Sequence, residues 1–176
     1  MANERDAMSQ ALLAAVNDED LAPLRALLAA GVDWSGPGYE AAEWGVTNAS
    51  LPILAALEDA GFPWRAPVPW ATSPAEAIPV VDNLLTQALL SGVTTPELVR
   101  FLLERGADPN LRVRGRPLLA AFLARGADLD LPVLEALLAA GPDVNAADAD
   151  GATPLMHAVS RPGDGRLEAV ARLLAA

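Results

Sequence analysis

The side chains best suited to chemistry in this sequence lie in the segment 143–151, which reads DVNAADADG. Asp and Asn oxygens suit Ca²⁺, and a calcium loop places them at alternate positions before a Gly, with a Glu six residues after it. Here Ala146 interrupts the alternation, and the residue six positions beyond Gly151 is His157. Asp and Asn also bond to nearby backbone groups in turns. We therefore interpret the segment as a turn and predict no metal ligand in it.

A second candidate is the basic run Arg112, Arg114 and Arg116, in which Arg occupies every other position. In an extended segment this spacing puts all three guanidinium groups on one side. A guanidinium binds a carboxylate or a phosphate through paired hydrogen bonds. Two interpretations remain open: a binding fork, or a solvated finger whose Arg residues pair with acids of the N-terminal half. Three Arg in so acidic a chain do not make a nucleic-acid site.

Residues for catalysis are scarce. With no Cys, no Lys and one His, the chain cannot form a Cys/His pair, a multi-His metal site or a Lys-dependent phosphate loop. The motifs G-x-S-x-G and H-E-x-x-H are also absent. No Ser or Cys is identified beside His157, so a surface or contact role is favoured over that of a general base. We predict no enzymatic activity, no catalytic residue and no cofactor.

The large aromatic residues are concentrated in one segment. All four Trp and the only Tyr lie between residues 34 and 70, at Trp34, Tyr39, Trp44, Trp64 and Trp70. Glu40 and Glu43 belong to the same segment, so a surface patch there would be both aromatic and acidic. Trp and Tyr are over-represented at binding hot spots because they bury large areas with few rotatable bonds.

The charge of the chain indicates the kind of partner. The formal net charge is −11. Residues 1–88 hold 12 acids and three Arg, a net charge of −9, whereas residues 89–176 hold 11 acids and nine Arg, a net charge of −2. Such a chain repels nucleic acids and anionic membranes and attracts a basic protein. We predict a basic protein partner, no nucleic acid and no membrane.

The elements that position these residues are helices, because Ala and Leu make up most of an apolar content of 52%. One unit recurs: two Leu, two further residues, Gly, and then an acid two positions later. Three clear copies end at Gly31, Gly106 and Gly141, and a degraded copy ends at Gly61. Gly ends a helix because it adopts the left-handed conformation without a Cβ clash.

Helix starts are also indicated by residue type. In the first repeat we expect helices at about 4–16 and 20–30. Asn3 with Asp6, and Asp18, are candidate N-terminal caps. Pro96 and Pro132 are expected in the first turn of their helices, where a missing N–H is tolerated.

The segment 148–158, DADGATPLMHA, resembles the opening of an ankyrin repeat, D-x-x-G-x-T-P-L-H-x-A. Small residues recur along the chain at 15, 45, 88, 121 and 158, and apart from the 43-residue interval from 45 to 88 this spacing is close to the family period of roughly 33 residues. The resemblance implies an all-α solenoid that forms one domain over 1–176. Proline excludes a helix at about 65–82, where Pro67, Pro69, Pro74 and Pro79 lie, so we expect a long proline-rich finger there in the third repeat. We expect that finger to be extended and ordered, with a floppy linker as the alternative. The five repeats are expected at 4–34, 35–64, 65–110, 111–145 and 146–176.

The resemblance also implies where a partner binds, since ankyrin proteins usually use the concave face formed by the fingers and first helices. The groove-facing slots of the five repeats hold Ala14, Trp44, Gln87, Ala120 and His157. Trp44, Tyr39 and Trp70 are favoured as contacts, whereas Trp34 and Trp64 occupy equivalent places and are expected to stack on each other between fingers. The predicted partner-binding residues are Trp34, Tyr39, Glu40, Glu43, Trp44, Trp64, Trp70, Arg112, Arg114 and Arg116.

We therefore expect a protein–protein interaction module, with an immunity or antitoxin-type inhibitor as one concrete form. The alternative is a homo-oligomeric structural or scaffold protein. The last helix, 167–176, has no closing Gly or outer cap, so either the chain is truncated there or a partner or second copy covers that face. A cytoplasmic location is expected, because there are no disulfides and residues 1–6 do not resemble a signal peptide.

Overall fold

The computed structural model describes residues 2–71, 78–91, 93–125, 129–160 and 165–176. The chain forms two compact units, residues 1–84 and residues 85–176, and the boundary lies inside helix α5. The elements are α1 (Ala2–Asn17), α2 (Leu21–Ala30), α3 (Pro37–Thr47), α4 (Leu51–Asp59), α5 (Val80–Ser91), α6 (Pro96–Glu104), β1 (Arg112–Val113), β2 (Arg116–Pro117), α7 (Leu118–Leu123), α8 (Leu131–Leu138), α9 (Pro154–Ser160) and α10 (Arg166–Ala175). The predicted all-helical fold is confirmed, while the assignment of a single domain stays a prediction.

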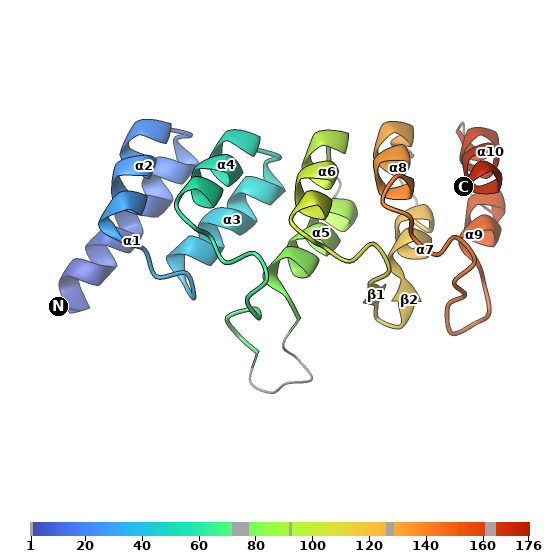
Figure 1. Ribbon diagram of the computed structural model, residues 1–176, viewed down its shortest axis with the longest axis horizontal. Coiled ribbons are helices and arrows are strands. Elements are labelled where there is room, and N and C mark those ends of the chain that lie inside the picture. Colours follow the sequence, from blue (N-terminus) through green and yellow to red (C-terminus); the bar gives the residue numbers. More distant parts are fainter. Residues whose placement is uncertain (1, 72–77, 92, 126–128, 161–164) are drawn as a thin grey trace. The chain divides into compact units, whose positions relative to one another are not determined.

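The first unit consists of helix pairs packed side by side. Helix α1 contacts α2 and α3, and α4 contacts α2 and α3, an arrangement that the reader can follow in Figure 1. Leu12, Leu24, Ile53 and Leu54 are fully buried between these helices. Burying each such side chain stabilises the fold by about 1.5–3 kcal/mol. Neither helix of a pair covers its own apolar face, so the stacked pairs form the core together.

The second unit repeats this arrangement. Helix α8 contacts α6 and α10, while α9 contacts α7 and α10. Its core is again mainly leucine, with Leu98, Leu102, Leu118 and Leu134 fully buried. Strands β1 and β2 form a short antiparallel hairpin that contacts α7. This hairpin places the Arg run at one end of the helices (Figure 1).

Helix ends follow the predicted residue types, with two exceptions among the predicted N-terminal caps. The glycines after α2, α4, α6 and α8 all have positive φ, from 70° to 99°. Pro96 and Pro132 lie in the first turns of α6 and α8, as predicted. The cap of α2 is Asp20, whose carboxylate accepts from the N–H of Ala22, so the assignment to Asp18 was wrong. Asn3 lies within α1 and not before it.

The proline-rich insertion is ordered at its base. The N–H of Val68 donates to the carbonyl of Ile78 at 2.9 Å, and the N–H of Val81 donates to the carbonyl of Trp64 at 2.8 Å. An isolated antiparallel bridge joins Pro67 to Pro79 just before α5 begins at Val80, and turns occupy residues 64–65 and 69–70. The extended conformation of the whole finger stays a prediction. Residues 72–77 of the predicted insertion lie outside the described residues. No helix among the residues that the structure describes is long and apolar enough to cross a membrane.

Candidate functional site

The prediction that Trp34 and Trp64 stack on each other was wrong, because Phe62 lies between them. The Phe62 ring contacts Trp34 at a centroid distance of 5.5 Å and Trp64 at 4.6 Å, both edge-on. Phe62 is 5% exposed and Trp64 is 8% exposed. Trp64 is therefore a core residue, which corrects its assignment as a partner contact. Trp34 is half-buried and packs over Gly38, where a Cβ would lie 2.5 Å from its ring.

Tyr39 was also predicted as a contact residue, but it lies in the core of the first unit with 3% exposure. Its hydroxyl accepts a hydrogen bond from Asn83 Nδ2 at 2.7 Å and donates one to Glu43 Oε1 at 3.0 Å. The ring supports Trp70, with centroids 5.1 Å apart and an interplanar angle of 85°. Tyr39 thus positions its neighbours and does not meet a partner itself.

The outer residues of this cluster are accessible. Trp70, at the base of the finger, is 54% exposed. Helix α3 carries Glu40, Glu43 and Trp44, of which Glu40 is exposed and the other two are half-buried. The helical spacing of 3 and 4 residues places these three side chains on one face of α3. We call Glu40, Glu43, Trp44 and Trp70 the aromatic–acidic patch.

The Arg run does not form an extended fork, because the chain reverses direction within it. Arg114 and Gly115 form the turn of the hairpin, with φ of 51° and 81°. Arg112 pairs with Pro117, and Val113 pairs with Arg116, so Arg112 and Arg116 project from opposite faces of the hairpin. The prediction that all three guanidinium groups share one side was therefore wrong.

Two of the three Arg side chains contact the turn segment 143–151. Arg112 donates to the carbonyl oxygens of Gly115 at 2.7 Å and Ala147 at 3.0 Å. Arg116 Nε lies 3.3 Å from Asp148 Oδ2. These partners belong to the second unit, whereas pairing with the acidic N-terminal half was the predicted alternative.

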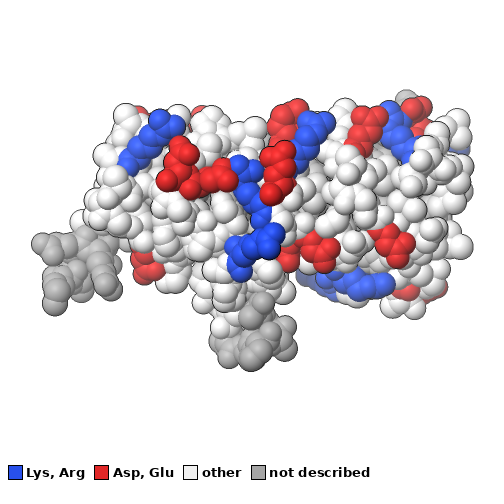
Figure 2. All heavy atoms as spheres, in the orientation of Figure 1, with Lys and Arg blue, Asp and Glu red and all other residues white. Residues whose placement is uncertain are grey.

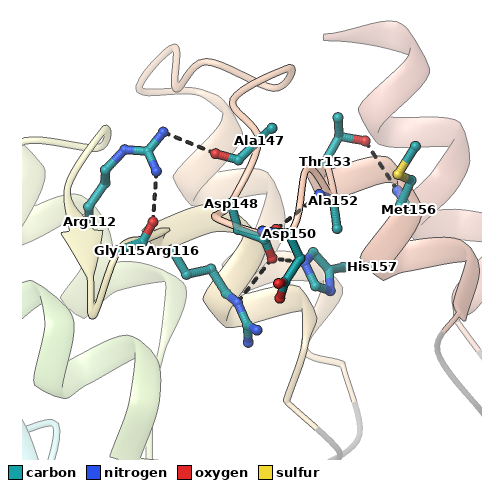
Figure 3. Close-up of polar contacts among 10 residues, drawn as sticks. All are labelled: Arg112, Gly115, Arg116, Ala147, Asp148, Asp150, Ala152, Thr153, Met156 and His157. Atoms are coloured by element: carbon teal, nitrogen blue, oxygen red, sulfur yellow. Dashed lines mark hydrogen bonds and ion pairs between the residues drawn. The ribbon is translucent and has the colours of Figure 1, made fainter.

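Asp148 is the centre of a hydrogen-bond network that joins the hairpin to α9 (Figure 3). Its Oδ1 accepts from the N–H groups of Asp150 and Ala152 at 3.0 and 2.9 Å, and its Oδ2 lies 2.9 Å from His157 Nε2. The side chain is only 4% exposed. The hydrogen bond to His157, followed by that from Ala152, lowers the pKa of Asp148 below its usual value.

These contacts confirm the interpretation of residues 143–151 as turns. The N–H of Asn145 donates to Asp143 Oδ1 at 2.9 Å, a local bond of the same type as those to Asp148. His157 is half-buried and bonds to Asp148 in this network, so a surface or contact role for it stays a prediction. Within the described ranges, no group of three or more His, Asp or Glu is arranged to hold a metal ion.

The geometry of helix pairs, glycine ends and projecting turns matches a known repeat. The family described as ankyrin repeats (3 copies) matches residues 84–176, which is more than half of the chain. The chain belongs to the ankyrin-repeat family. Ankyrin repeats are protein–protein interaction modules, so this is the general function of the chain.

Similar curated proteins also contain ankyrin repeats. Ankyrin repeat and SOCS box protein 6 of Mus musculus is 35% identical over 119 residues, which cover 68% of this chain and 25% of that protein. The Homo sapiens protein of the same name is 43% identical over 65 residues, 37% of this chain and 15% of that protein. The chain thus spans a quarter or less of the length of these relatives.

The ankyrin register predicted the groove-facing slots only in part. Ala14 is exposed and Gln87 and Trp44 are half-buried, but Ala120 is fully buried in α7. Sequence reasoning also missed Phe62 and Asn83. Phe62 follows the helix-ending Gly61, a place where an apolar residue packs back on the helix. Asn83 carries no such signal, because its partner Tyr39 is 44 residues away.

Proposed function

We propose that this ankyrin-repeat chain is a cytoplasmic module that binds a basic protein through the aromatic–acidic patch of its first unit. The observation that carries the proposal is the exposed Trp70, which Tyr39 supports from below while donating a hydrogen bond to Glu43. A large aromatic surface and a carboxylate are thereby held close together. An Arg or Lys side chain of a partner finds a π face and a counter-charge in one place.

The energetics fit a charged partner. A cation over an exposed Trp face contributes about 0.5–1 kcal/mol, and more when the contact excludes water. Charged side chains of both signs lie among uncharged ones on the face drawn in Figure 2, so the summed charge and not a single-sign face carries the long-range attraction. Residues 1–84 hold 12 acids and three Arg, a net charge of −9. The electrostatic attraction of this net charge speeds association with a cationic protein.

One concrete form of this function is an immunity or antitoxin-type protein that covers a cationic toxin domain. A scaffold or regulatory adaptor is the more general form. Both need the same surface, and they differ in whether the bound partner loses its activity. An activity measurement on the captured partner, with and without the chain, distinguishes them.

The test compares capture of proteins by wild-type chain and by two variants of equal charge. Glu43→Gln removes one carboxylate from the patch, while Asp59→Asn removes one from the exposed end of α4 in the same unit. We expect basic proteins to be captured at low salt, to be released at high salt and to be lost with Glu43→Gln only. Equal losses with both variants would show that only the overall charge matters, and capture of no basic protein would reject the proposal.

A second candidate function, self-assembly, is favoured by a different observation. Leu167 and Leu174 of α10 are 77% and 70% exposed and lie seven positions apart, on one face of the helix. An apolar stripe of this kind is typical of a helix that packs on another surface. Sedimentation equilibrium tests it: Leu174→Glu should dissociate an oligomer, whereas Val93→Glu, at another exposed apolar residue, should not. A monomeric wild-type chain would exclude this candidate.

A further inference from the structure

The second unit contains a groove of about 530 Å³ beside the β1–β2 hairpin. The residues that line it are Leu90, Val113, Arg114, Arg116 and Ala121. Val113 and Arg116 pair across the hairpin, so their side chains share the hairpin face that borders the groove. Three apolar side chains and two guanidinium groups thus converge on one concave surface.

Arg114 holds an unusual backbone conformation for its residue type. Together with Gly115 it forms a two-residue turn with positive φ at both positions, for which Asn-Gly is the favoured sequence. A left-handed conformation is unfavourable for a residue with a long side chain. Within the described ranges, the Arg114 side chain makes no hydrogen bond or ion pair. Neither the turn nor an internal contact therefore explains why Arg is present here.

Arg116 is fixed in place on the same groove. Its Nε faces Asp148, which is itself held by His157 and by two backbone N–H groups. The Arg116 side chain is 41% exposed, and its terminal nitrogens make no hydrogen bond in the part of the chain that the structure describes. A guanidinium oriented in this way, with its outer edge accessible, can donate hydrogen bonds to a planar carboxylate.

We propose that this groove, called the Arg groove below, binds an acidic peptide segment of a protein partner. A Glu or Asp side chain of the segment pairs with Arg114 and Arg116. An adjacent apolar side chain packs on Leu90, Val113 and Ala121. The proposal goes beyond the function described above, because it concerns other residues and a ligand of the opposite charge.

Charge and shape favour a carboxylate over a phosphate. Asp148 already pairs with Arg116, so the groove does not present two full unneutralised charges to a dianion. The apolar residues that line it suit a peptide side chain and offer nothing to a nucleic-acid backbone. The net charge of −11 further opposes a polyanion, whereas a single carboxylate on a short segment brings little additional repulsion.

The test is selection of a display library of random heptapeptides on the full chain and on two variants. Arg114→Asn places the residue that the turn prefers and removes one groove guanidinium. Arg100→Gln removes an Arg from the exposed face of α6, where it pairs only weakly with Glu97 at 3.3 Å, and serves as the control of equal charge. Thermal unfolding of each variant shows that the fold is retained.

We expect the wild-type chain to enrich peptides with Glu or Asp next to Leu, Ile or Val. Arg114→Asn should lower recovery of this class about tenfold, the effect of one lost charge-assisted hydrogen bond, while its thermal midpoint stays equal or rises. Arg100→Gln should retain the class. Absence of an acidic class, or an acidic class that Arg114→Asn leaves unchanged, would overturn the proposal.

A second measurement separates the two possible anions. A selected peptide and its phosphoserine counterpart, with phosphoserine in place of Glu, are titrated against the chain while fluorescence anisotropy is recorded. Equal or tighter binding of the Glu peptide supports the Arg groove as a carboxylate site. Much tighter binding of the phosphoserine peptide, by more than about tenfold, would identify a phosphopeptide site instead and overturn the proposal.

Discussion

Trp70 packs edge-on against Tyr39, with ring centroids 5.1 Å apart and an interplanar angle of 85°. The two rings differ sharply in exposure, at 54% for Trp70 and 3% for Tyr39. One ring thus belongs to the core and holds the other at the surface. Substitutions at the two positions should therefore separate binding from stability.

Trp70→Ala is expected to weaken binding of a basic partner at least tenfold while lowering the free energy of unfolding by only about 0.5–1.5 kcal/mol, the contribution of an edge-to-face aromatic pair. The reason is that more than half of the Trp70 side chain is already in water. Calorimetric titration of the partner and urea unfolding measure the two quantities. A stability loss above about 3 kcal/mol would show that Trp70 is part of the core.

Tyr39→Phe is expected to lower the free energy of unfolding by about 1–2 kcal/mol, because it removes the hydroxyl that joins Asn83 to Glu43. The ring remains, so Trp70 should keep its position and its fluorescence. The double variant with Asn83→Ala provides the control. Since both changes break the same 2.7 Å hydrogen bond, their effects should be less than additive, and full additivity would contradict the network.

Ala49→Gly is expected to stabilise the first unit by about 0.5–1 kcal/mol. Ala49 has a φ of 52° in the turn between α3 and α4, a conformation that Gly adopts without a Cβ clash. The same substitution inside α4, Ala55→Gly, should destabilise by about 1 kcal/mol because it weakens a helix. Urea unfolding measures both variants, and a destabilising effect at residue 49 would contradict the assigned turn.

Asp148 should make the second unit sensitive to acid. Its pKa in the folded chain is lowered, chiefly by the hydrogen bond to His157, so its contribution to stability is complete above the usual Asp pKa near 4. That contribution is lost as the pH falls through the lowered pKa. Asp148→Asn should therefore reduce stability at neutral pH and flatten its acid dependence.

The control for this change is Asp150→Asn, which removes the same charge from an exposed neighbour. Urea midpoints measured from about pH 6 to pH 2 provide the comparison, a range that spans the usual Asp pKa. We expect the two curves for wild-type chain and Asp148→Asn to converge at low pH, while Asp150→Asn follows the wild type. Parallel curves for all three proteins would exclude a role for the Asp148 network in stability.

Helix ends were predictable from the sequence because their causes are local. Gly after α2, α4, α6 and α8 takes positive φ, and Pro96 and Pro132 begin helices, as their residue types require. The turn at residues 143–151 was predictable for the same reason, since Asp143 and Asp148 bond to backbone groups two to four residues away. The ankyrin motif extended these local signals to the whole fold.

The candidate binding surfaces depended on contacts that the sequence does not display. Tyr39 and Trp70 look equivalent as aromatic residues of one segment, yet one is buried and the other exposed. The reversal at Arg114 and Gly115 separates Arg112 from Arg116, which the alternating spacing had placed together.

By itself, the sequence determined the repeat family, the helix ends and the imbalance of charge between residues 1–88 and 89–176. The repeat motif and the helix ends depend on residue types within a few positions of one another, and the charge imbalance depends only on the sum of the charged residues. The tertiary structure alone decided which aromatic and Arg side chains reach solvent, because exposure depends on what packs above a residue. Asn83 reaches Tyr39 across 44 residues, and Asp148 fixes Arg116 across helices α7 and α8.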